Sequence, residues 1–539
     1  MTRCAGDPTF RLSALWLTFG VSLCLPASAQ FLHFDKLFGG PNEEVAFQII
    51  PRADSGYLIV GSTGSYGPGA SDQNSNGFVV KVDNNGDPEW QFALGASGPD
   101  YFTSVSVTAN GDYFLVGNRV NTGQQDVNLT LTRLTSSGTV LWIKEIGTDD
   151  RSEYANRIIQ FGDSAFIIVG SRLDQGGGID GNVMALMVDD EGNITWTAEY
   201  GCGQQIDPKD VTVAADGALL VAGGMFAGSQ SSSVLMKVIG DGSLIWGKVH
   251  QQIQNSCFNR SLVALTDGGC FTTGSGGGNS AALSRYSPGG NLLWRQGYAG
   301  AQYNNGSDLV FSSPTRVALT VNCSYPSVQP AIGAVLLTDT SGHIVDQASF
   351  GSTASSSFTI TSSLLRDMDG GILLVGSSEV DPVPRDLMLK RMSISGDLFG
   401  EHCQGVDILL QEVELPPVSL GPTITQLDDP VLTVTELNWT PVAVEAYETV
   451  CTNVGLDTPI EIVQARCFPN PVKDILYIDV PSTCKTPVVS VFDATGRSMF
   501  VGRYTPGSGL AVRDLAPGLY HSLMTCGSGV PYTLRFEVE

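Results

Sequence analysis

Residues 183–200 read VMALMVDDEGNITWTAEY, and this stretch contains the pattern that decides the fold. An apolar run ends in a cluster of acidic residues, Gly192 follows, and Trp196 stands four residues later. Apolar runs bounded by Gly, Asp and Asn are typical of short strands joined by tight turns. The stretch therefore predicts a β-hairpin whose second strand carries a tryptophan.

The same turn glycine and tryptophan recur along the chain at a nearly constant step. The pairs are Gly86/Trp90, Gly138/Trp142, Gly192/Trp196, Gly242/Trp246 and Gly290/Trp294, and the glycine alone returns at Gly342 and Gly396. Successive glycines are 52, 54, 50, 48, 52 and 54 residues apart. An apolar run that ends in glycine keeps the same step at Gly61, Gly117, Gly170, Gly223, Gly274 and Gly376, with Asn322 in the sixth slot. Units of this length with four short strands are typical of β-propeller blades.

The two ends of the repeat region indicate how the ring closes. Residues 31–39 (FLHFDKLFG) have the form of a fourth strand but precede the first complete unit, and the last unit ends weakly near residue 398. We expect this N-terminal strand to complete the seventh blade, because the pairing closes the ring and removes a free strand edge. The prediction is an all-β chain with a seven-bladed propeller over residues 30–404, a bridging segment with some strands over 405–465, and a small immunoglobulin-like sandwich over 466–539.

The composition agrees with a chain of buried strands joined by turns. Glycine accounts for 63 of 539 residues and charged residues for 15%, against typical values of about 7% and 25%. The formal net charge of −25 argues against a nucleic-acid partner, because the phosphate backbone would be repelled.

The N-terminus predicts export. Arg3 and Arg11 precede an apolar run over residues 12–25, and residues 26–29 (PASA) supply small residues for cleavage. Residues 1–29 are therefore expected to be a secretory signal peptide. The alternative, a membrane anchor, needs about 20 apolar residues rather than about 14. No later run is long enough, and we therefore expect no transmembrane segment.

The glycine–tryptophan pattern resembles the tryptophan-docking repeat of quinoprotein-type propellers, and the whole unit is similar to secreted bacterial propeller repeats. The likeness covers about residues 31–402. It implies that Trp90, Trp142, Trp196, Trp246 and Trp294 are structural residues that bury aromatic area between blades. The cofactor-binding carboxylates of quinone enzymes are not recognisable, so no cofactor is expected.

One segment of the first unit has calcium-like spacing. Asp72, Asn74 and Asn76 precede Gly77 in a D-x-N-x-N-G pattern, and Asp83 stands at loop position 12. Oxygen ligands at alternate positions suit calcium. Against this, Asp83 replaces the usual glutamate and a strand begins inside the loop, while Asp and Asn also favour ordinary tight turns. A weak calcium site and a plain turn both remain open.

The last 73 residues carry an ordered set of short motifs. CFPNPVKDILYI spans residues 467–478, VVSVFDATGR spans 488–497, and LAPGLY spans 515–520. The set closely resembles the type A C-terminal sorting domain of cargo for the type IX secretion system of Bacteroidota. The motif residues that the resemblance implies are Pro469, Asn470, Pro471, Asp493, Gly496, Pro517, Gly518 and Tyr520. It implies the type IX secretion machinery as a partner and a secreted or cell-surface location, and the alternative is an ordinary immunoglobulin-like module.

Catalytic motifs are not apparent in the sequence. The five histidines fall in different units without metal-ligand spacing, and no Gly-x-Ser-x-Gly elbow is present. The sequence therefore favours a non-catalytic binding or adhesion protein with a glycan or protein ligand. The alternative is an extracellular hydrolase or lyase that acts on polysaccharide at the propeller mouth, which carboxylate, His, Tyr or Arg side chains converging from several blades would favour. A purely structural surface coat is the third interpretation.

Overall fold

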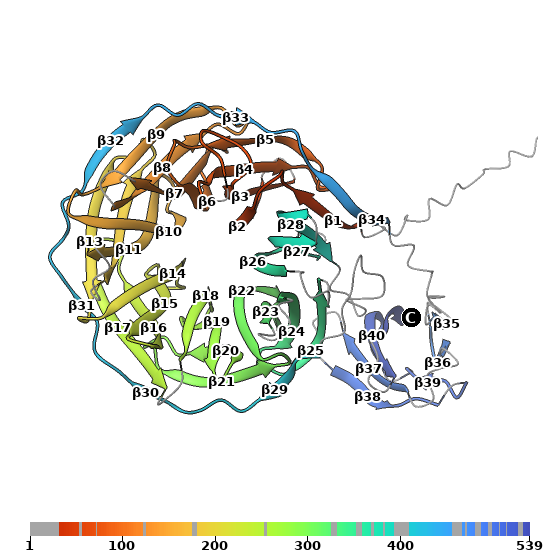
Figure 1. Cartoon of the computed structure of the whole chain (residues 1–539). Helices are drawn as coiled ribbons and strands as arrows, with labels where there is room; N and C mark the ends of the chain where they lie inside the picture. Colours follow the sequence, from red (N-terminus) through yellow and green to blue (C-terminus); the bar gives the residue numbers. More distant parts are fainter. Residues whose placement is uncertain are drawn as a thin grey trace, which may run out of the picture.

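The computed structural model describes residues 32–52, 56–71, 73–121, 126–174, 181–252, 256–324, 331–351, 358–367, 371–380, 383–392, 409–454, 466–468, 472–479, 487–493, 498–505, 507–513, 515–526 and 532–538. The secondary-structure elements in these ranges are all β-strands, and the strands of the repeat region form a ring of blades (Figure 1). The all-β prediction is therefore confirmed. The expected signal peptide, residues 1–29, lies outside the described ranges.

Seven antiparallel blades surround a common axis, and in blades 1 to 6 the strands follow chain order from the innermost outward. Blade 1 holds β2 (Glu44–Pro51), β3 (Tyr57–Thr63), β4 (Asn76–Val82) and β5 (Pro88–Leu94). Blade 2 holds β6 (Asp100–Val107), β7 (Tyr113–Asn121), β8 (Asp126–Leu134) and β9 (Val140–Gly147). Blade 3 holds β10 (Arg151–Phe161), β11 (Ala165–Asp174), β12 (Gly181–Asp189) and β13 (Ile194–Gly201), and blade 4 holds β14 (Gln205–Val213), β15 (Leu219–Ala227), β16 (Gln230–Val238) and β17 (Leu244–Gln252). Blade 5 holds β18 (Phe258–Ala264), β19 (Cys270–Gly277), β20 (Ser280–Tyr286) and β21 (Leu292–Ala299).

Blade 6 holds β22 (Tyr303–Ser313), β23 (Arg316–Ser324), β24 (Ala331–Asp339) and β25 (Ile344–Phe350). Blade 7 takes three strands from the end of the repeat, β26 (Phe358–Arg366), β27 (Ile372–Val380) and β28 (Val383–Met392), and one from the N-terminus, β1 (Leu32–Phe38). β1 pairs antiparallel with β28, with Phe34 opposite Arg391 and Phe38 opposite Leu387. The predicted seven blades and their closure by the N-terminal strand are confirmed.

Aromatic rings of blades 1 to 5 and of β1 dock on the turn glycine of the following blade. A Cβ atom added to Gly138 would lie 2.9 Å from the Trp90 ring, and one added to Gly192 would lie 2.3 Å from the Trp142 ring. The same contact repeats at the next three blade junctions, so the turn glycine leaves the space that the preceding blade's tryptophan fills. At the ring closure Phe34 of β1 takes the tryptophan's place against Gly86, at 2.7 Å.

Residues 409–454 form a belt that runs around the outside of the ring, against the order of the blades (Figure 1). The belt adds a fifth, antiparallel strand to six blades. Its strands are β29 (Gln411–Val413) on β21, β30 (Val418–Leu420) on β17, β31 (Thr425–Gln426) on β13, β32 (Thr433–Leu437) on β9, β33 (Val442–Ala443) on β5 and β34 (Glu448–Val454) on β1. The segment expected only to bridge two domains therefore covers the outer edges of the propeller.

Buried side chains and amides hold the belt in place. Leu410, Ile424 and Val444 of the belt are 2–5% exposed. Gln347 of blade 6 accepts the Leu410 N–H at 2.8 Å and donates to the Leu410 carbonyl at 3.2 Å, as a strand partner would. Because an outer strand otherwise leaves unpaired N–H and C=O groups in solvent, these contacts cap edges that each blade alone would expose.

The C-terminal module consists of two small sheets. One contains β35 (Arg466–Phe468), β36 (Ile475–Asp479) and β39 (Leu510–Ala511), and the other contains β38 (Ser498–Arg503), β37 (Pro487–Asp493), β40 (Gly518–Cys526) and β41 (Tyr532–Val538). Leu476 and Ile478 of the first sheet share one buried cluster with Val489, Val491 and Phe536 of the second. The module therefore has a core of its own.

Two shortened chains separate the contribution of the belt from that of the module. A chain that ends after residue 408 lacks both, and a chain that ends after residue 454 lacks only the module. We expect the shorter chain to melt about 5–10 °C lower than the longer one and to aggregate, because the outer strands regain unpaired edges. Scanning fluorimetry with light scattering measures both effects, and identical curves for the two chains would contradict the stabilising role of the belt.

Candidate functional site

The innermost strand of every blade contains a bulge, and a polar residue lies within or just after it. These seven residues, which we call the axial ring, are Gln48, Ser104, Arg157, Asp210, Ser261, Asp308 and Ser363. A bulge pushes the strand backbone toward its neighbour. A Cβ on Gly61 would lie 1.8 Å from the Val45 carbonyl oxygen, and one on Gly170 would lie 1.7 Å from that of Tyr154. The recurrent glycine of the second strand is therefore a steric requirement of the bulge.

The axial ring joins neighbouring blades through one repeated hydrogen bond. Its acceptor is a ring side chain, and its donor is the backbone N–H just past the ring position of the next blade. The contacts are Val105 N to Gln48 Oε1 at 2.8 Å, Ile158 N to Ser104 Oγ at 3.1 Å, Leu262 N to Asp210 Oδ2 at 3.0 Å and Leu364 N to Asp308 Oδ2 at 2.7 Å. The ring thereby fixes the height of one blade relative to the next.

Two buried carboxyls of the ring share a hydroxyl. Ser261 Oγ lies 2.9 Å from Asp210 Oδ2 and 2.6 Å from Asp308 Oδ1. A hydroxyl has one hydrogen to donate, so one carboxyl must supply a second proton. Desolvation raises the pKa of Asp308, while Arg157 Nε lies 3.0 Å from Asp210 Oδ1. Asp308, whose pKa is raised, is therefore the carboxyl that we expect to share a proton with Ser261, and Arg157 pairs with Asp210.

Carboxyls at the start of three innermost strands hold the loop that precedes each strand. Glu44 accepts the Gly40 N–H at 3.0 Å, Asp100 accepts the Ala96 N–H at 2.6 Å, and Glu153 accepts the Thr148 N–H at 3.0 Å. Desolvation raises the pKa of all three, that of Asp100 to about 7. The raised pKa values of these three carboxyls thus come from a structural role, because each carboxyl anchors a loop on one face of the propeller.

Aromatic and polar side chains stand next to the ring on four consecutive innermost strands. Tyr101, Tyr154, Asp207 and Phe258 each precede the ring residue of their blade by three positions, and Asn156, Lys209 and Arg260 precede it by one. We call these seven residues the axial arc. Asn156 Nδ2 donates to Asp207 Oδ1 at 2.8 Å, Lys209 pairs with Asp207, and the Arg260 guanidinium lies 5.2 Å from the Phe258 ring centroid.

The charges of the arc act across blades. Burial is the main cause that raises the pKa of Tyr101 of blade 2 to about 12. Tyr154 of blade 3 and Asp207 of blade 4 raise it further by their charges. These couplings join residues on the innermost strands of blades 2, 3 and 4. The Arg260 side chain is exposed to solvent, and desolvation by the surrounding protein lowers its pKa. Both observations fit a side chain that water reaches inside a protein-lined space. The arc is the strongest candidate for a ligand site on the propeller axis.

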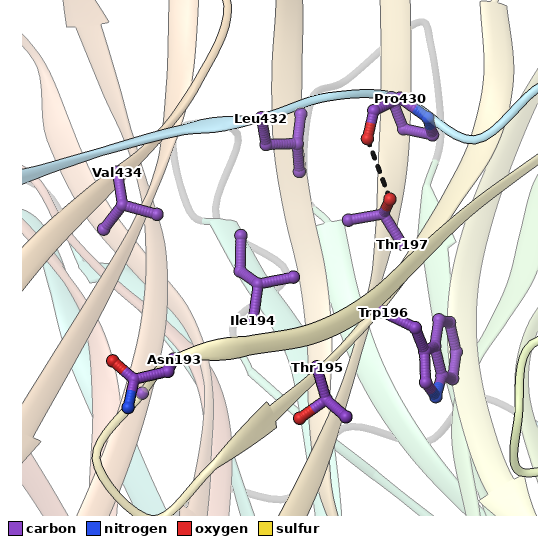
Figure 2. A pocket seen from close by; sticks show the side chains of 9 residues that line it. Asn193, Ile194, Thr195, Trp196, Thr197, Pro430, Leu432 and Val434 are labelled. Atoms are coloured by element: carbon purple, nitrogen blue, oxygen red, sulfur yellow. Dashed lines mark hydrogen bonds between the residues drawn. The ribbon is translucent and has the colours of Figure 1, made fainter.

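Cavities also lie where the belt crosses between blades. One of about 480 Å³ separates the start of β13 from belt residues Pro430, Leu432 and Val434, and Thr197 Oγ1 donates to the Pro430 carbonyl at 2.8 Å beside it (Figure 2). A cavity of about 380 Å³ occupies the equivalent place on blade 2, between Trp142 and Trp439. The Trp196 and Trp142 rings each pack one side on Gly242 and Gly192, so these rings serve blade docking.

His250 occupies a packed position, as its place in a fourth strand suggests. His250 is 3% exposed, and its Nε2 lies 3.1 Å from the Gly290 carbonyl oxygen. Because a carbonyl oxygen only accepts, Nε2 carries the hydrogen of this bond. Tyr200 and Tyr298 make the same bond to Gly242 and Gly342 one blade before and one blade after. Desolvation lowers the pKa of His250 to about 4, so the imidazole is neutral and structural.

Two residues of the calcium-like pattern, Asn76 and Asp83, are held apart by a strand. Asn76 and Asp83 lie at opposite ends of β4, which spans Asn76–Val82. Asp83 Oδ1 accepts the N–H groups of Asn85 and Asp87 in a turn, and Asn74 Nδ2 donates to the Gly69 carbonyl at 2.7 Å. Asp72 lies outside the described residues. Among the side chains that the structure places, no group of three or more His, Cys, Asp or Glu is arranged to hold a metal ion.

The sorting motif is partly described. Asp493 and Tyr520 are opposite each other on β37 and β40. Tyr520 is 4% exposed, donates to the Ala516 carbonyl at 2.8 Å and stacks on Phe536. Pro517 is exposed and Gly518 opens β40, whereas Pro469, Asn470, Pro471 and Gly496 lie outside the described residues. Tyr520 is thus a core residue of the module.

The axial arc was not identified from the sequence, although a signal for it exists. Tyr101, Tyr154, Asp207 and Phe258 each stand 16 residues before the recurrent glycine of their unit, at Gly117, Gly170, Gly223 and Gly274. Counting back from that glycine locates them. Only the ring geometry shows that these positions face one axis.

Comparison with known proteins identifies the C-terminal module. Residues 466–530 match the family described as the secretion system C-terminal sorting domain. The chain therefore carries a sorting domain behind a seven-bladed propeller, and this domain indicates export to the cell surface or the medium. No helix in the described residues is long and apolar enough to cross a membrane.

The propeller resembles solved structures only in its fold. Puromycin hydrolase is 13% identical with a TM-score of 0.37, and the match covers 63% of this chain and 51% of that one, about half its length. Sqt1 of Chaetomium thermophilum is 14% identical with a TM-score of 0.38, covering 66% and 96%. The extracellular domain of a putative one component system of B. thetaiotaomicron is 9% identical with a TM-score of 0.23, covering 92% and 81%. A search of the curated proteins found no match to this chain.

The buried imidazole predicts a pH dependence. The pKa of His250 is about 4 in the folded chain and about 6.5 in the unfolded chain. Between these values only the unfolded chain binds the proton, so the stability that His250 contributes falls as the pH falls from 6.5 toward 4. Relative to His250→Gln, which keeps a neutral N–H donor, the unaltered protein should lose about 3 kcal/mol across this window.

Urea denaturation of both proteins at about pH 7 and about pH 4 measures the difference, and the other titrating groups cancel because both chains carry them. His343→Gln is the matched control. Glu412 raises the pKa of the exposed His343, so its effect has the opposite sign. A His250→Gln variant that tracks the unaltered protein at both pH values would refute the assignment.

Proposed function

We propose that this protein is an exported, non-catalytic binding or adhesion module whose propeller recognises an extracellular glycan or protein through the axial arc. The observation that carries the proposal is the arc itself: aromatic rings from Tyr101, Tyr154 and Phe258 alternate around the axis with hydrogen-bonding and charged groups. Aromatic faces bind apolar faces of a ligand while amides and charges bind its polar edges.

The state of the tyrosines supports binding over catalysis. Burial raises the pKa of Tyr101 to about 12 and also raises that of Tyr154. A general base works best with a pKa near the working pH, and these hydroxyls are shifted away from it. They therefore suit hydrogen bonding and stacking rather than proton abstraction.

A polysaccharide hydrolase or lyase is the second candidate, and one observation favours it. Tyr101, Asp207 and Arg260 come from three different blades and interact electrostatically near one axis. Converging carboxylate, tyrosine and arginine side chains are what such an enzyme would need. Incubation of the full chain with soluble polysaccharides, followed by size-exclusion analysis of the products, separates the two candidates, because a binder leaves the polymer length unchanged.

Binding through the arc predicts a specific loss on mutation. The full chain is screened on a glycan array and against extracellular proteins, and the ligand so found is titrated with Tyr154→Ala and Phe258→Ala. We expect each variant to bind about tenfold more weakly, since an aromatic contact contributes about 1 kcal/mol beyond its area. Leu293→Ala, which removes a 59% exposed apolar side chain from an outer strand, is the matched control. Unchanged binding in both arc variants would reject the arc as the site.

The delivery part of the proposal rests on the sorting domain. We propose that the type IX secretion machinery recognises residues 466–539, with an immunoglobulin-like arrangement of the two sheets, after a signal peptide has taken the chain across the inner membrane. A chain that ends after residue 454 keeps the belt and should accumulate in the periplasm. Cell fractionation with an antibody against the propeller measures this, and normal surface exposure or release of the shortened chain would contradict it.

A further inference from the structure

A polar cavity of about 280 Å³ lies on the perimeter of blade 2, where the belt strand β32 crosses it. It is separate from the axial arc, which is on the innermost strands, because this cavity is bounded by the outer strand β9, the ends of β7 and β8, and the belt. The lining residues that matter are Arg119, Asn128 and Glu145 on the blade and Thr433 and Thr435 on the belt.

Glu145 organises the blade side of the cavity. Its carboxylate accepts Arg119 Nη1 at 2.6 Å, Asn128 Nδ2 at 2.9 Å and Asn121 Nδ2 at 3.2 Å. These bonds hold the guanidinium and the two amides in fixed orientations. Asn128 Oδ1, the other end of one amide, is inaccessible to bulk solvent and has no hydrogen-bond partner. Because a Cβ added to Gly147 would lie 2.1 Å from Asn128 Oδ1, this oxygen is turned toward the Gly147 backbone. The polar groups open to a ligand are therefore those of Arg119, Glu145 and the belt threonines.

Blade 3 contains the same triad, but there the space is filled. Arg172, Asn182 and Glu199 occupy the equivalent positions, and Arg172 and Asn182 both donate to Glu199. A second arginine, Arg151, also donates to Glu199 at 3.0 Å. No arginine stands at the corresponding place in blade 2, where the innermost strand starts only at Asp100.

The belt makes the second difference between the two blades. Thr435 is opposite Glu145 in the pairing of β32 with β9. In blade 3 the Leu427 N–H donates to the Glu199 backbone carbonyl, so Leu427 is the belt residue opposite Glu199. The Leu427 side chain lies 3.1 Å from the point where a Cβ on Gly201 would be. A leucine that closes the space over blade 3 is thus replaced over blade 2 by a small hydroxylated residue.

We propose that the blade 2 cavity binds a single neutral sugar residue. Arg119, Thr433 and Thr435 offer donors, and Glu145 and the two threonine hydroxyls offer acceptors, which matches the paired donor and acceptor character of sugar hydroxyls. The volume equals about nine water molecules, the size of one small polar molecule. The wall holds two carboxylates, Glu145 and Asp149, and one guanidinium, Arg119, so its net charge is negative. A negative wall disfavours an anionic ligand. The site does not depend on binding at the axial arc.

The structure supplies its own blocking variant. Thr435→Leu copies the residue that closes blade 3, and it leaves Glu145 and its partners in place. Asn128→Ser, which removes the amide that orients Glu145, is a second variant in case the leucine disturbs the belt. Val442→Leu, which enlarges a 39% exposed belt residue over blade 1, is the matched control.

The probes are glucose, galactose, mannose and N-acetylglucosamine, each mixed with the full chain. Saturation-transfer NMR reports binding, and hydrogen exchange of residues 433–437 reports its place. We expect at least one sugar to give a transfer signal and to slow exchange at this segment, Thr435→Leu to abolish both effects, Asn128→Ser to weaken binding about tenfold, and Val442→Leu to change neither.

The outcomes distinguish this site from the axial arc. Binding that survives both Thr435→Leu and Asn128→Ser overturns the proposal, including the case in which that binding is lost in Tyr154→Ala. Absence of transfer from all four sugars also overturns it, and leaves the proposed function of the arc unaffected.

Discussion

The docking of an aromatic ring on the turn glycine of the following blade is the contact on which the rest of the propeller depends. A four-stranded blade has two apolar faces and must bury both against neighbours. The tryptophan at the start of the outer strand in blades 1 to 5 supplies a large apolar surface at the junction, and a Cβ on the facing glycine would lie only 2.3–3.1 Å from that ring. Phe34 makes the same contact at Gly86. The ring can close because its N-terminal strand carries an aromatic residue at the position of the missing tryptophan.

The buried polar groups follow from this packing. Innermost strands crowd together at the axis, and a bulge in each strand turns one polar side chain toward the next blade. A buried polar group must be hydrogen-bonded, and the axial ring satisfies this by accepting N–H groups across junctions. Asp308 shares a hydrogen bond with Ser261, and Arg157 pairs with Asp210. The perturbed pKa values of the ring and of Glu44 and Glu153 thus reflect architecture, whereas the groups of the axial arc are placed where a ligand could reach them.

The belt gives the perimeter a chemistry that the repeat does not have. Its 46 residues, 409–454, include seven acidic and no basic side chains, and they differ from blade to blade where the repeat is nearly constant. Blades 2 and 3 share an Arg–Asn–Glu triad, but Thr435 and Leu427 of the belt make one cavity open and the other closed. A segment outside the repeat thereby distinguishes blades that the repeat made alike.

The sequence by itself determined the blade count, the closure by residues 31–39, and the sorting domain, because each depends on a local pattern: a turn glycine, a tryptophan four residues later, or an ordered set of short motifs. The same local evidence placed Trp90 and its counterparts at strand starts and His250 in a packed fourth strand. The calcium-like spacing of Asn76 and Asp83 was local as well, but a strand intervenes and holds the two residues at its opposite ends.

Only the tertiary structure decided which residues meet. Leu410 reaches Gln347, and Thr435 reaches Glu145 nearly 300 residues away in the chain. These pairings depend on the path of the belt around a closed ring, and no spacing rule encodes that path. Tyr101, Asp207 and Arg260 likewise come from separate units, and they share an axis only because seven blades close around it. The physical reason is the same in both cases: strand and turn patterns report local backbone preferences, whereas a binding site on a ring is built from contacts whose partners the ring closure alone selects.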